Sequence, residues 1–444
     1  MKRTKLPALM LCAAMAAMLP SAAVAAPARD SGIGVVEVRA APDFDLPAVQ
    51  LRIGLDRILA EHAFLIIEAM RTASSGGDEF EVAAAVLEGN TVELVDMIDT
   101  AYGADAAEAF AEQWRNHIAF LVDYTRAAAD GDDDARDLAS SQLQTYIDDF
   151  SEFLVAANPG LPPDVVKGLI DEHVQQLEQI ASLTDDDYSD AYPGIRETYA
   201  HMFMVGDGLA LGIVDRFGDR FDGRETAFSP ALDLRLTFDR LLGEHTYLTA
   251  IAMRARLNDA PDLEAAIAAL DESTNQLAAQ IGTLYGADSA TAFDELWTRN
   301  TGLFVEYVAA VGADDGEAQQ AAIDGLDRYK SDFDAFLVDA NPTIAAGELE
   351  ALIETHTEQL VAQVAAYRDG DFETAYGSLR DAYGHTELVA AALAGAIADQ
   401  FPQQFPDAAL IREGANAALV SAGLLLLSSV AVLVGRRHRM RLTA

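Results

Sequence analysis

The stretch Arg57-Ile-Leu-Ala-Glu-His62 returns as Arg240-Leu-Leu-Gly-Glu-His245, which is 183 residues further along the chain. Apolar residues around the first copy recur at intervals of three and four, the spacing that lines one face of an α-helix. The histidine of each copy falls on that apolar stripe. A helix with this pattern buries one side against other helices, so the sequence predicts a helical core built twice.

The same offset aligns many other positions of the two halves. Aromatic and turn residues pair as Trp114 with Trp297 and as Ala157-Asn-Pro159 with Ala340-Asn-Pro342. After a slip of one residue, His201 aligns with His385. Each unit is about 175 residues long, too long for a solenoid repeat. We therefore predict a tandem duplication, with one domain at 44–221 and a second at 228–405.

Each unit is predicted to be an up-and-down bundle of six α-helices. In the first unit the helices are expected near 44–72, 79–101, 105–129, 132–156, 162–184 and 187–216. Glycine pairs, Asp-Gly and Asn-Pro steps separate them, because these residues stop a helix. Few β-branched runs compete, so the fold class is all-α.

The two ends carry targeting signals rather than core. Residues 1–26 show a basic start, an apolar run and a small-residue cleavage site, the pattern of a signal peptide. Residues 417–434 form an uncharged run that just reaches membrane-spanning length, and residues 435–444 form a basic tail. These features predict a single-pass membrane protein with its large N-terminal part outside the cytoplasm and its tail inside.

The composition of the chain excludes several kinds of functional site and partner. The formal net charge is −42. A surface this acidic repels nucleic acid and attracts cations. The single cysteine, Cys12, lies in the predicted signal peptide, so disulfides and thiolate ligands are excluded from the mature chain. No P-loop, nucleophile elbow, His-Glu-x-x-His or dinucleotide motif occurs. No residue identifies a reaction, and the partner protein is left open.

Histidines are the main candidates for a site. Seven of the eight occupy equivalent places in the two units, near the middles of the first, third, fifth and sixth helices, with Asn300 standing where His117 would recur. Mid-helix groups of different helices can meet at one level of a bundle. An acid four residues before the sixth-helix histidine shares its face. The predicted metal ligands are His62, His117, His173, His201 and Glu197 in the first unit, and His245, His356, His385 and Asp381 in the second.

Three interpretations of these histidines stay open. Imidazole and carboxylate without thiolate suit copper, zinc or iron, with copper favoured by the exported location. Alternatively, the histidines are hydrogen-bonded core residues of an envelope spacer or interaction protein. A third interpretation is haem b held between two axial imidazoles.

The runs Glu61-His-Ala-Phe-Leu, Trp114-x-x-His, Glu172-His-Val and Ala200-His-Met202 resemble a family of exported bacterial helical proteins often labelled "copper amine oxidase". The resemblance covers 44–217 and 228–401. It implies a helical, exported protein and a link to copper. The Asn-Tyr and His-x-His motifs that the enzyme name implies do not occur in this chain, so no oxidase activity is carried over.

Overall fold

A computed structural model describes residues 43–73, 76–183 and 188–405 of the chain. Within these ranges the protein is all-α, as predicted, and no strand occurs. The predicted signal peptide, the apolar run 417–434 and the basic tail lie outside the described residues.

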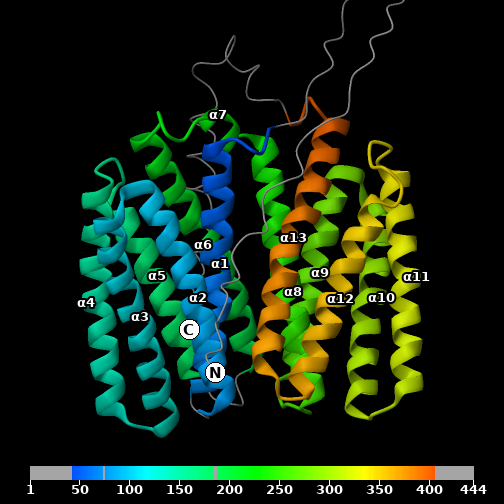
Figure 1. The fold of residues 1–444 in the computed structure, drawn as a ribbon, viewed down its shortest axis with the longest axis horizontal. Helices are drawn as coiled ribbons and strands as arrows, with labels where there is room; N and C mark the ends of the chain where they lie inside the picture. Colours follow the sequence, from blue (N-terminus) through cyan, green and yellow to red (C-terminus); the bar gives the residue numbers. More distant parts are fainter. Residues whose placement is uncertain (1–42, 74–75, 184–187, 406–444) are drawn as a thin grey trace, which may run out of the picture. The chain divides into compact units, whose positions relative to one another are not determined.

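The first six helices pack together as a bundle, which we call the first bundle (Figure 1). Its members are α1 (Pro47–Ala73), α2 (Asp78–Tyr102), α3 (Ala104–Asp130), α4 (Asp133–Ala157), α5 (Pro163–Ser182) and α6 (Tyr188–Arg216). Every predicted helix of this unit is present, with ends within about three residues of those expected from the breaks in the sequence.

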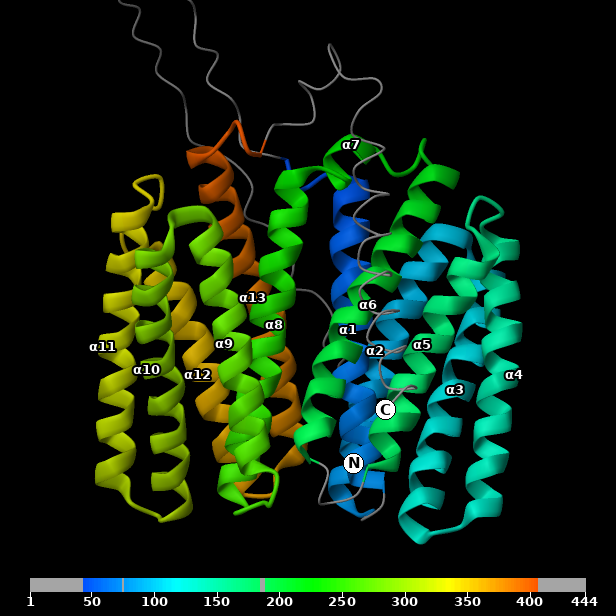
Figure 2. The same cartoon turned by 180° about the vertical axis from the view of Figure 1, so that it is seen from behind.

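A short helix, α7 (Arg224–Ala227), connects to six further helices that form the second bundle (Figure 2). They are α8 (Pro230–Leu257), α9 (Leu263–Tyr285), α10 (Ala287–Gly312), α11 (Gly316–Ala340), α12 (Glu348–Arg368) and α13 (Phe372–Gln400). Both bundles belong to one compact unit.

Acidic residues start several of these helices. Asp132 caps α4 by accepting a hydrogen bond from the backbone N–H of Ala135 at 3.0 Å. Asp315 caps α11 in the same way. A carboxylate at a helix N-terminus satisfies a free N–H group and interacts favourably with the helix dipole. The acidic runs Asp132–Asp134 and Asp314-Asp315 therefore help to fix where these two helices begin.

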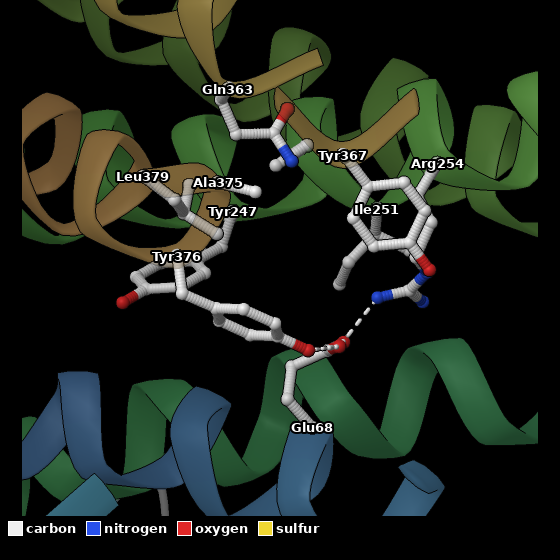
Figure 3. A pocket seen from close by; sticks show the side chains of 10 residues that line it. Glu68, Tyr247, Ile251, Arg254, Gln363, Tyr367, Ala375, Tyr376 and Leu379 are labelled. Atoms are coloured by element: carbon white, nitrogen blue, oxygen red, sulfur yellow. Dashed lines mark hydrogen bonds and ion pairs between the residues drawn. The ribbon is translucent and has the colours of Figure 1, made fainter. Parts of the chain in front are cut away.

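The bundles meet along a seam made by α1, α2 and α6 on one side and α8, α9 and α13 on the other. Helices α1 and α8 are buried on almost all sides, so their charged residues need partners inside the protein. Figure 3 shows one such group, in which Arg254 of α8 and Tyr376 of α13 converge on the Glu68 carboxylate of α1, at 2.5 Å and 3.1 Å. Burial alone would raise the pKa of Glu68, but Arg254 and Arg71 lower it to about 2.

Gly206 of α6 lies directly against the backbone of α1. A Cβ atom added there would lie 2.8 Å from the Cα and 2.9 Å from the backbone nitrogen of Asp56. Backbone atoms can relieve such a clash only if the two helices move apart. Gly206→Ala is therefore expected to lower the free energy of unfolding by about 3 kcal/mol. Gly208 of the same helix has open space around its Cα. Gly208→Ala should raise the stability by about 0.5–1 kcal/mol. Urea denaturation measures both, and equal effects would contradict the close packing.

The prediction of a single-pass membrane protein is not borne out by the described residues, and the run 417–434 on which it rests lies outside them. Among the described residues, no helix combines the length and the apolar character needed to cross a bilayer. The longest helices, α6 and α13, each carry acidic and basic side chains along their length.

Candidate metal centre

Three histidines from three helices converge inside the first bundle. They are His62 of α1, His117 of α3 and His173 of α5, and one ligand nitrogen of each lies within 4.8 Å of the others. The Nε2 atoms of His62 and His117 are 3.3 Å apart, so one imidazole can donate a hydrogen bond to the other. We call these three residues the triad. Two nitrogens bound at 2.0–2.1 Å to one tetrahedral ion would be about 3.3 Å apart, so this pair already has the required separation.

Burial keeps the triad uncharged. The exposed fractions of His62, His117 and His173 are 0%, 1% and 5%. Desolvation lowers the pKa of His117 to about 3, and burial together with the neighbouring imidazoles lowers those of His62 and His173 well below the usual value. Neutral imidazole is the form that binds metal ions, so these ligands need no deprotonation at neutral pH.

Aromatic side chains hold the triad in place. The Trp114 ring lies 4.7 Å from that of His62 and 4.6 Å from that of His117, measured between centroids. Tyr146 stacks on His117 at 5.0 Å with an angle of 18°. His173 also lines a small cavity of about 20 Å³ among apolar groups, including Met202 of α6. This apolar shell excludes water and restricts the rotation of the imidazole rings.

Most nitrogens of the triad have no hydrogen-bond partner within the chain. Nδ1 of His62, Nδ1 of His117 and both ring nitrogens of His173 are buried without one. Buried polar atoms in folded proteins are nearly always satisfied. An ion bound by Nε2 of His62, Nε2 of His117 and one nitrogen of His173 would replace the contact between the first two and satisfy one unpartnered nitrogen of His173, so the donor set fits a metal ion.

The remaining predicted ligands of the first unit lie outside the triad. His201 is buried, but its Nε2 donates to the carbonyl oxygen of Leu169 at 2.8 Å, and its ring is stacked parallel to that of His173 at 6.5 Å. Glu197 is exposed, since the buried face of α6 runs through Thr198 and Tyr199 instead. The acid nearest to His201 is Glu172 of α5, with 3.9 Å between its Oε2 and the His201 Nδ1.

In the second bundle the corresponding residues form no such group among the residues described. His245 accepts a hydrogen bond from Trp297 Nε1 at 3.0 Å. His385 Nε2 donates to the Leu352 carbonyl at 2.9 Å, and Asp381 is exposed.

A cavity of about 30 Å³ takes the place of the triad in the second bundle. His245, His356 and Asn300 are among the residues that line it. Burial lowers the pKa of His245 to about 3 and that of His356 to about 4. Because Asn300 offers an amide where the first bundle has the imidazole of His117, the two bundles present different donor sets.

Comparisons with known proteins add no constraint on this geometry. The chain matches no protein-family description, no curated protein and no solved structure.

Proposed function

We propose that the protein binds one transition-metal ion per chain in the first bundle, through His62, His117 and His173. The observation that carries the proposal is the meeting of three neutral, buried imidazoles whose ligand atoms lie within 4.8 Å, with four of their nitrogens unpartnered. A core histidine that serves packing alone does not need two further imidazoles at this distance. The ligand roles first assigned to His201 and Glu197 are not part of the proposal.

Copper is the favoured ion, and its monovalent form fits the charge of the site. The groups that perturb the pKa values of the triad are burial, imidazoles and a backbone group, with no carboxylate among them. The bound ion would therefore keep its full charge in an apolar setting, and the cost of burying charge rises steeply with its size. Imidazole suits both copper and zinc, so the divalent zinc ion is the competing occupant.

Haem b does not fit this arrangement. The cavity beside His173 has a volume of about 20 Å³, far below that of a porphyrin, and aromatic rings fill the surroundings of the triad.

The purified full chain tests the proposal by elemental analysis and by competition with a chromophoric chelator for Cu⁺ and for Zn²⁺. We expect one tightly bound ion per chain, copper over zinc, and no Soret band. A protein that binds neither ion would show that the three histidines serve packing only, as in a spacer or interaction protein.

The two bundles also support a tandem duplication as the origin of the chain. Helices α3 and α10 start 183 residues apart, as do α4 and α11, and α6 and α13 start 184 apart. These separations equal the sequence offsets. The proposed history explains why the shell of the triad recurs around His245, where the third imidazole is missing.

A further inference from the structure

Glu61 directly precedes His62 and is held by the second bundle. Its side chain is buried, and Arg380 of α13 contacts it twice, with Nε 3.0 Å from Oε1 and Nη2 2.7 Å from Oε2. Tyr247 of α8 donates to Oε1 at 3.3 Å. Asn90 of α2 completes the set at 2.8 Å. Two helices of the second bundle therefore fix the residue next to a member of the triad.

A reciprocal contact occurs on the other side of the seam. Glu244 directly precedes His245, and Arg196 of α6 contacts it with Nε at 3.0 Å and Nη2 at 3.2 Å. Arg196 and Arg380 are 184 residues apart, at equivalent places in the two units. Each bundle thus holds, through a bidentate arginine, the glutamate beside the other bundle's histidine. Bidentate pairs fix orientation as well as distance.

Successive residues of an α-helix point about 100° apart. Glu61 points toward the seam while His62 points into the first bundle, so an arginine that fixes Glu61 also fixes the rotation of α1 about its axis. The rotation of α1 sets where the His62 imidazole lies relative to His117 and His173. An error of a few tenths of an ångström at this point changes the fit of all three ligands.

We propose that Arg380 is a positioning residue of the metal centre, through which the second bundle controls the metal affinity of the first. This inference rests on the metal site proposed above. Thermodynamic linkage makes the control reciprocal, so that an ion in the triad strengthens the contact between Arg380 and Glu61 by the same factor. The second bundle then has a role although it lacks a triad of its own.

The test compares two variants of the full chain. Arg380→Gln removes the clamp on the triad helix, and Arg196→Gln removes the equivalent clamp beside His245. We expect the dissociation constant for Cu⁺, measured by chelator competition, to rise about tenfold in Arg380→Gln. It should stay within about twofold of the wild-type value in Arg196→Gln. Arg380→Lys keeps the charge but loses the bidentate geometry. Its dissociation constant for Cu⁺ should lie between those of the two glutamine variants.

Amide hydrogen exchange gives a second measurement that loss of stability alone would not reproduce. Adding Cu⁺ should slow exchange in α13 around Arg380 in the wild type and leave it unchanged in Arg380→Gln. Equal affinity losses in the two glutamine variants, or none in Arg380→Gln, would overturn the positioning role while the metal site stands. A wild-type protein that binds no ion would remove the metal site itself.

Discussion

Replacing His117 with asparagine is expected to abolish tight metal binding while the fold survives. The second bundle already carries an asparagine at the equivalent position, Asn300, within a closely similar shell of side chains. The substitution removes one of three imidazole ligands, so the affinity should fall by more than about 100-fold, beyond the range typical of residues that only support ligands. Elemental analysis and chelator competition measure the loss.

The reverse exchange is the matched control. Asn300→His places a third imidazole beside His245 and His356, which line one cavity. Metal binding in the first bundle should be unaffected, and the number of bound ions should rise from one to two per chain. Unchanged binding in His117→Asn, together with a normal unfolding curve, would show that the triad holds no ion.

Acid is expected to destabilise the protein below about pH 6.5 through two buried histidines of the second bundle. His245 and His356 have folded-state pKa values of about 3 and about 4, below the unfolded value of 6.5. The unfolded chain therefore binds more protons as the pH falls below 6.5. Each of the two histidines then lowers the free energy of unfolding by about 1.4 kcal/mol per pH unit, until the pH reaches its folded-state pKa. Together the two histidines lower the free energy of unfolding by roughly 5 kcal/mol between pH 6.5 and pH 4.5, which is a large part of the total stability of a typical protein.

Two buried carboxyl groups act in the opposite sense. Burial raises the pKa values of Asp56 and Asp239, so both favour the folded state as they take up protons. The double variant His245→Gln/His356→Gln isolates the histidines. Its unfolding midpoint on acid titration should shift to lower pH than that of the wild type. Comparison at pH 8, where these histidines are neutral in both states, separates protonation from packing. An unshifted midpoint would contradict the prediction.

The helices could be predicted from the sequence because the residues that start and end them act locally. Gly103 and Gly131 adopt positive φ angles at helix ends, and Asp132 caps the next helix. Each of these is visible as a break in the apolar spacing. The inward direction of His62 was also predicted correctly, since its neighbours at three and four residues are apolar.

The exact membership of the triad could not be predicted, because it depends on how far each helix slides along its neighbours. His201 lies at a similar depth to His173, yet its ring turns to donate to Leu169. A spacing of four residues placed Glu197 on the same side of α6, but that side faces solvent at this turn. The arginine clamps were missed too. Arg196 and Arg380 recur in the sequence, but only the packing of the bundles shows that each reaches the opposite one.

The seam also determines the order in which the chain can complete its fold. Glu61 is separated from Arg380 by 319 residues, so its main partner is synthesised long after α1. At about 5–20 residues per second this interval lasts roughly 15–60 s. During that time Glu61 and Glu68 of α1 lack the arginine partners from the second bundle that they have in the complete fold. If the proposed centre forms in the first bundle, we expect it to reach its full metal affinity only after α13 has packed against α1.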